Sequence, residues 1–122
     1  MIILLVVVGF MLWLRDWTTS GSMDAFLEEH ENPDVTPELI FLIGEACYTA
    51  QETKAAAHYY RWAIDKYPEQ KFIPRARFHL AVSLEDTGNR SGAMEQYVIL
   101  KDSFSATDYG RTAKSRWEHS KF

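Results

Sequence analysis

The chain has 122 residues, of which 47% are hydrophobic and 14% aromatic, so it can form one modest globular domain. The net charge of −4 is unevenly distributed. From Arg15 to Thr36 there are six acids and one arginine, whereas from Pro37 onward there are twelve Lys or Arg and eleven Asp or Glu. Neither part has the basic excess of a nucleic-acid-binding protein, which excludes that class of partner. The single cysteine excludes an intrachain disulfide.

Residues 1–14, MIILLVVVGFMLWL, contain no charged side chain. As a helix they would reach ~21 Å, short of the ~30 Å hydrocarbon core of a bilayer. We interpret residues 1–17 as a membrane-anchor helix, with Trp13 and Trp17 at the membrane interface and Arg15 extending its charge toward water. A short span fits a thinned bilayer or packing against other membrane helices. Two alternatives stay open: a cleaved export signal, and a helix buried in a larger assembly.

Residues 18–36 are predicted to be a linker and a short acidic helix, the helix over Met23–Glu31. Asn32-Pro33 then predicts a turn. Thr36 is expected to be the N-cap of the next helix, with Pro37 at its first position and Glu38 near the positive end of the helix dipole.

The pattern of small and large apolar residues in Leu39–Pro68 recurs 37 residues later, which indicates an internal repeat. The pairs in register hold small or large residues of the same kind: Gly44 with Ala81, Ala56 with Ala93, Tyr60 with Tyr97, and Phe72 with Tyr109. A third copy starts, with Ala113 and Trp117 in phase, and then stops. Each copy predicts a helix pair that stacks on its neighbour to bury its apolar face.

The expected helices run from Thr36 to about Ala50, about Thr53 to Tyr67, about Ile73 to Asp86, about Ser91 to Ser103, and about Tyr109 to His119. Gly88 is the expected stop after the third of these. The two linkers, Tyr67–Ala76 and Phe104–Ala113, share an aromatic–turn–aromatic–Arg–Ala pattern and are expected to have the same shape. The last helix would cover the end of the array as a cap.

The repeat resembles the tetratricopeptide repeat. The first copy matches at Gly44, Ala56, Tyr60, Ala63 and Pro68. The second matches at Leu80, Ala81, Gly88, Ala93 and Tyr97, and departs at Leu100 and Ser105, while Cys47 stands where the family usually has tyrosine. The resemblance implies an all-α fold: an array of about two helix pairs over residues 37–122, with repeats at about 37–70 and 74–107 and a capping helix at 109–119. The long linkers resemble those of bacterial envelope members of the family, such as outer-membrane assembly lipoproteins, which implies an extracytoplasmic domain.

No catalytic or cofactor chemistry is predicted. The four histidines lack the spacing of metal ligands, and no cysteine pair accompanies them. Glu28-Glu29 and Glu85-Asp86 are adjacent on helices, where neighbouring side chains point about 100° apart and do not form a facing carboxylate pair. Phosphate-binding glycine loops and nucleophile-elbow motifs are absent from the sequence.

The remaining prediction is a binding surface. In the family that the chain resembles, the first helix of each pair lines a concave groove, which implies a partner-binding set here: Glu38, Phe41, Glu45, Tyr48, Thr49, Arg75, Phe78, Val82, Glu85 and Asp86. Of these, Phe41, Tyr48 and Phe78 are candidate anchors for a partner's helix or extended segment. Alternatively, they are covered by the acidic N-terminal helix or are plain surface. The Lys and Asn set with which some family members grip a C-terminal carboxylate is missing.

A short array of this kind usually needs about three repeats to be stable alone. We therefore expect a non-catalytic, single-pass membrane-anchored adaptor that binds other protein subunits of a membrane complex. A self-assembling scaffold, in which the concave face takes the next copy, is an alternative. So is a secreted periplasmic protein whose N-terminus is an export signal.

Overall fold

The structure is a computed structural model that describes residues 1–19 and 21–120. Within these residues it contains seven α-helices, which confirms the all-α prediction. The chain divides into two compact units, Met1–Thr36 and Pro37–Phe122, and each is described by itself.

The first unit consists of α1 (Ile2–Thr19) and α2 (Ser22–Glu29). The apolar side chains of α1 from Ile2 to Leu14 are exposed around its circumference, from 80% for Ile3 to 36% for Leu14. None of the described helices is by itself long and apolar enough to cross a membrane. By length and composition alone, residues Ile2–Trp17 of α1 satisfy that requirement only together with α2, as a bent pair.

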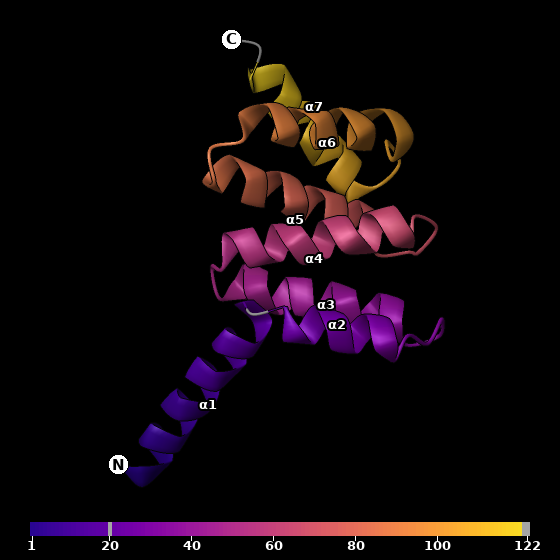
Figure 1. Ribbon diagram of the computed structural model, residues 1–122. Coiled ribbons are helices and arrows are strands. Elements are labelled where there is room, and N and C mark those ends of the chain that lie inside the picture. Colours follow the sequence, from indigo (N-terminus) through magenta and orange to yellow (C-terminus); the bar gives the residue numbers. More distant parts are fainter. Residues whose placement is uncertain (20, 121–122) are drawn as a thin grey trace. The chain divides into compact units, whose positions relative to one another are not determined.

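The second unit is a helix stack of α3 (Thr36–Thr49), α4 (Thr53–Lys66), α5 (Ile73–Asp86), α6 (Arg90–Ser103) and α7 (Asp108–Ser120). Figure 1 shows these helices layered in chain order. Each packs against the next, and α5 also touches α7. This sequential packing is consistent with a helical repeat array.

The core of the helix stack is built from the small and large residues that recur in the sequence. Tyr60 and Tyr97 are fully buried between neighbouring helices, next to Ala56 and Ala93. Gly44 lies under the ring of Tyr60, where a Cβ atom would come within 3.1 Å of two ring carbons. A small residue at this position therefore lets α3 and α4 approach closely.

The turns inside the two helix pairs have the same geometry. Gly88 adopts a left-handed φ of 87° after α5, and Asn89 N–H donates to Leu84 C=O while Gly88 N–H donates to Glu85 C=O. This pair of bonds is a Schellman motif, which confirms Gly88 as the stop residue. Gln51 holds the equivalent place after α3 with a φ of 62°, a conformation that costs a non-glycine residue about 1–2 kcal/mol.

The start of α3 differs from the prediction by one residue. Thr36 is already helical, and Pro37 therefore takes the second position. Because Thr36 is itself helical, it is not the N-cap of α3, and its hydroxyl oxygen accepts a bond from the backbone N–H of Asn32, at 2.7 Å. The threonine thus fixes the turn before α3.

The two linkers between pairs begin with the same turn, in which Gln70 N–H donates to Tyr67 C=O and Thr107 N–H to Phe104 C=O, but they end differently, contrary to the prediction of one shape. α5 begins at Ile73, whereas α7 begins at Asp108, two positions earlier in the 37-residue register. The reason is Thr107, whose hydroxyl donates to Phe104 C=O at 2.7 Å and accepts from Gly110 N–H at 3.0 Å. Gln70 holds the equivalent place in the first linker and has no short hydroxyl to cap a helix there.

Candidate functional site

A cluster of polar side chains joins α3, α4 and α5 at the level of Tyr60. Glu45 Oε1 accepts a hydrogen bond from the Tyr60 hydroxyl and lies 2.7 Å from His79 Nδ1. The Tyr60 hydroxyl is also 3.2 Å from His79 Nδ1, and Arg75 Nη2 approaches the other carboxylate oxygen of Glu45 at 2.7 Å. One glutamate from α3 therefore holds groups from two other helices.

The electrostatics of this cluster favour the ionised glutamate. Burial raises the pKa of Glu45, but the hydrogen bonds from Tyr60, His79 and Arg75 and the attraction of His79 outweigh it, so the pKa lies below its ordinary value of 4.5. Burial, reinforced by the bond to the Glu45 carboxylate, raises the pKa of the Tyr60 hydroxyl well above its ordinary range. The tyrosine is therefore a neutral hydrogen-bond donor at physiological pH.

The three aromatic side chains predicted as partner anchors are packed against neighbours. Phe41 stacks on Phe72 with ring centroids 4.5 Å apart and an interplanar angle of 1°. Tyr48 stacks on His79 at 4.2 Å and 6°. Each of the two is half-buried, so it offers a partner the edge or outer face of a ring in place of a protruding side chain.

Phe78, the third predicted anchor, lies in the next layer of the helix stack. Its ring contacts those of Tyr97 and Tyr109, and the Arg116 guanidinium carbon lies 5.1 Å from its centroid. Arg116 Nη1 donates to the Tyr97 hydroxyl at 3.2 Å, as His79 approaches Tyr60 one repeat earlier. Burial, with a bond to Glu85, raises the pKa of Tyr97 to about 12, although Arg116 opposes the shift.

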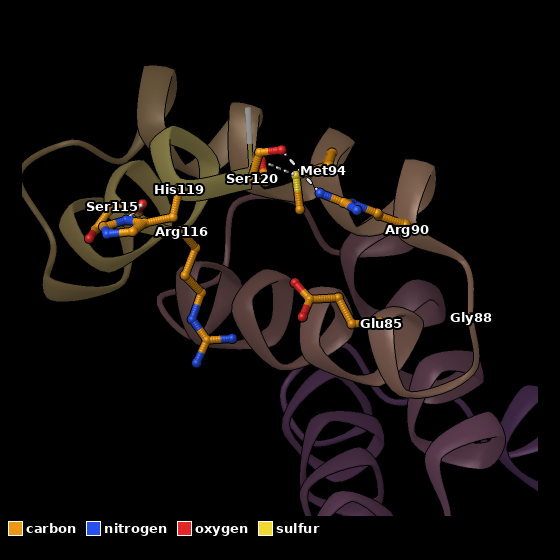
Figure 2. Close-up of a pocket in the computed structure, with 8 residues that line it drawn as sticks. All are labelled: Glu85, Gly88, Arg90, Met94, Ser115, Arg116, His119 and Ser120. Carbon is orange, nitrogen blue, oxygen red and sulfur yellow. Dashed lines mark hydrogen bonds between the residues drawn. The ribbon is translucent and has the colours of Figure 1, made fainter. Parts of the chain in front are cut away.

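Two cavities open on this part of the helix stack. The larger, about 530 Å³, is lined by side chains of α5, α6 and α7 and by the turn at Gly88; Figure 2 shows its lining residues. We call it the α5–α7 cavity, and its lining is Glu85, Gly88, Arg90, Met94, Ser115, Arg116, His119 and Ser120. The second, about 490 Å³, is lined by Glu38 and Phe41 of α3 and by the linker residues Glu69 to Phe72.

The predicted groove residues are thus brought to the first helices of the two pairs, but with different exposure. The exposed members are Glu38, Thr49, Arg75, Glu85 and Asp86, and the half-buried members are Phe41, Glu45, Tyr48, Phe78 and Val82. Glu38 and Phe41 line one cavity and Glu85 lines the other. Their role in binding a partner stays a prediction.

The residues predicted at a membrane interface lie on α1. Trp13 is 58% exposed and stacks on Trp17, with ring centroids 5.7 Å apart and an interplanar angle of 11°. Phe10 continues this aromatic row on the other side of Trp13, at 5.9 Å. Arg15 lies between the two tryptophans in sequence, near the end of the apolar run. Their position at an interface also stays a prediction.

The sequence prediction missed His79 and Arg116, which contact the two buried tyrosines, and Tyr109, whose ring contacts those of Phe78 and His79. The 37-residue register held the signal, because Arg116 occupies in the third copy the position that His79 occupies in the second. The arginines and serines of the α5–α7 cavity were also missed. They come from three helices and do not form a local motif in the sequence.

In residues 1–19 and 21–120, His, Cys, Asp and Glu side chains do not gather in a group able to hold a metal ion. Cys47 is half-buried against the core, and burial, with the charge of Glu52, raises the pKa of its thiol. A thiol held in its protonated form is a poor nucleophile.

Comparison with known proteins gives no assignment. No protein-family model matches the chain, and a search of curated proteins returns no significant match.

Proposed function

We propose that this protein is a non-catalytic, membrane-anchored adaptor, in which α1 enters the membrane and a tetratricopeptide-like helix stack binds other protein subunits. The observation that carries the proposal is α1. Its apolar side chains are exposed around the whole helix, and a helix that is apolar on all sides is stable in lipid or among other apolar helices. The aromatic row of Phe10, Trp13 and Trp17 at the end of the apolar run supports a membrane interface there.

The binding role rests on the first helices of the two pairs. Their surface combines stacked aromatic rings with exposed charges and the cavity beside Glu38 and Phe41, a mixture common at protein-binding sites. The polar cluster around Glu45 fixes α3 against α5, so this surface is held in one arrangement before a partner binds. A preorganised surface loses less entropy on binding. We propose an extracytoplasmic position for it, from the resemblance of the linkers to those of envelope proteins.

The experiment is gentle detergent extraction from native membranes, followed by native sizing and identification of the proteins that co-migrate. The proposal expects a large particle with defined foreign subunits. A particle that contains this chain alone would favour the self-assembling scaffold. Recovery from the soluble fraction of a chain without residues 1–14 would contradict the anchor and favour an export signal.

Substitutions then test the surface. Phe41→Ala with Tyr48→Ala removes two stacked rings, and we expect at least about a tenfold loss of co-migrating subunits, since aromatic anchors dominate such interfaces. Trp62→Ala is the matched control, because Trp62 is a half-buried aromatic on α4, a second helix of a pair. Thermal denaturation of each variant separates lost binding from lost folding. Equal recovery of subunits with the double variant and the control would remove the groove from the proposal.

A further inference from the structure

The α5–α7 cavity is rich in cationic side chains. Arg90 enters from the first turn of α6 and Arg116 from α7, with His119 on the same wall, whereas Glu85 is the one acid in the lining (Figure 2). Arg90 Nη2 donates to Ser120 C=O at 3.0 Å, and Arg116 Nη1 donates to the Tyr97 hydroxyl. Each guanidinium has five N–H donors, so these bonds leave further donors for a ligand. Two guanidinium groups in the lining of one cavity favour a carboxylate ligand.

The same chain carries an acidic segment that fits this requirement. No Lys or Arg occurs between Arg15 and Lys54, and residues 24–34 contain five Asp or Glu. Glu28 and Glu29 are exposed and form the last two positions of α2, where the negative end of the helix dipole favours a cation. These two carboxylates therefore oppose the negative end of their own helix.

In the α5–α7 cavity, a cation lies unfavourably at the positive end of a helix. Arg90 is the first residue of α6, whose first turn has no acid, so a positive side chain stands at the positive end of the helix. Each unfavourable placement is relieved when Glu28 and Glu29 meet Arg90 and Arg116. Charge complementarity of this kind, with both partners supplied by one sequence, favours association between copies.

We propose that the α5–α7 cavity of one copy binds the acidic end of α2, at Glu28 and Glu29, from a second copy. The contact joins two different surfaces and is therefore heterologous, so it leads to a ring or to an open chain of copies. It uses neither Phe41 nor Tyr48 and goes beyond the adaptor function. An adaptor of this kind would present several foreign-subunit sites side by side.

The test is sedimentation velocity of the full chain in detergent micelles over a range of protein concentrations. We expect association that grows with concentration and weakens when NaCl rises from about 50 mM to about 500 mM, because the contact is electrostatic. Arg90→Glu with Arg116→Glu should weaken it about tenfold or more, since like charges then meet. Glu28→Lys with Glu29→Lys should weaken it to a similar extent. An equimolar mixture of the two variants should associate again, because each supplies the surface that the other lacks.

Lys54→Glu with Arg61→Glu is the matched control, since it changes the charge equally at two exposed positions of α4. The control should associate like the wild type. Arg90→Gln tests the cavity without touching the Arg116–Tyr97 bond, should the double variant fail to fold. Association that neither charge-reversed variant weakens, that the control weakens equally, or that mixing does not restore would overturn the proposal.

Discussion

At the scale of single residues, Glu45 has the most partners in the polar cluster. Its carboxylate accepts from Tyr60 and lies within hydrogen-bond distance of His79 and Arg75, so one side chain ties α3 to α4 and α5. A buried tyrosine hydroxyl without a partner would be costly, and Glu45 removes that cost for Tyr60. The same position in the next copy is Val82, and there Glu85 and Arg116 serve the hydroxyl of Tyr97.

The lowered pKa of Glu45 predicts how stability depends on pH. A carboxyl group with a lower pKa in the folded protein stabilises the fold above its unfolded pKa, ordinarily 4.5, and this contribution is lost as pH falls through the folded pKa. We expect Glu45→Gln to cost about 1–2 kcal/mol at pH 7, because charge-assisted bonds are replaced by neutral ones. Urea unfolding at pH 7 and at about pH 4 measures both effects.

The variant should also lose less stability than the wild type on acidification, since it lacks the titrating group. Glu95→Gln is the control, because Glu95 is exposed away from the ends of α6 and should change stability little. A Glu45→Gln protein as stable as the wild type at pH 7, with an unchanged acid profile, would contradict the importance of this carboxylate.

At the scale of elements, the positions at which α5 and α7 begin set the lengths of the two linkers. Thr107 caps α7 and starts it early, which brings the first turn of α7 under the end of α6. Gly110 lies at the point of closest approach, where a Cβ atom would overlap the carbonyl oxygen of Phe104. Ile73 holds the equivalent place in the longer first linker, where there is room for a side chain. The short linker therefore depends on one glycine.

Gly110→Ala should accordingly destabilise the helix stack although alanine is the better helix former. The clash is with backbone, which cannot rotate away, so we expect a loss of about 2–4 kcal/mol. Thermal denaturation followed by circular dichroism measures it. Thr112→Ala, at an exposed position of α7, is the control and should change stability by less than about 0.5 kcal/mol. Gly110→Ala melting at the wild-type temperature would mean that the linker moves freely.

The sequence predicts the helices and their order because the 37-residue register repeats the residues that pack, such as Tyr60 and Tyr97. It does not predict that α7 starts earlier in the register than α5. That difference comes from one capping interaction, which Thr107 makes and the equivalent residue Gln70 does not. The candidate site shows the same limit. The sequence does not predict that Glu45 and Arg75 pair with each other between α3 and α5, and their role in binding a partner stays a prediction. Such contacts depend on side-chain placement, which residue spacing does not specify.

At the scale of the whole molecule, the chain combines an apolar first helix with a helix stack of near-neutral charge. Residues 15–36 carry six acids and one arginine, whereas the region from Pro37 onward carries twelve Lys or Arg and eleven Asp or Glu, so the negative charge of the chain lies before the helix stack. In water the first helix would promote non-specific association, because its apolar side chains are exposed along most of its length. Membrane insertion removes that surface from water.

Placing charge in α1 should therefore release the protein from membranes. Val7→Arg with Met11→Arg puts two cations in the apolar run, each costing about 2.5–3.5 kcal/mol at the centre of a membrane helix. We expect most of the protein to leave the carbonate-resistant membrane fraction. Ser91→Arg with Thr112→Arg adds the same charge at exposed positions of the helix stack and should leave that fraction unchanged. Retention of both double variants in membranes would argue that α1 is not the anchor.

The half-buried Cys47 is a natural probe for the opening of the first helix pair. It is the only thiol in the chain, and its raised pKa keeps it slow to react while α3 stays packed. The half-buried thiol is labelled slowly while α3 stays packed, and an alkylating reagent modifies it faster when that helix opens and exposes it fully to water. The labelling rate of the unmodified natural protein therefore times the opening of its first helix pair, in micelles or in membranes, without an introduced probe.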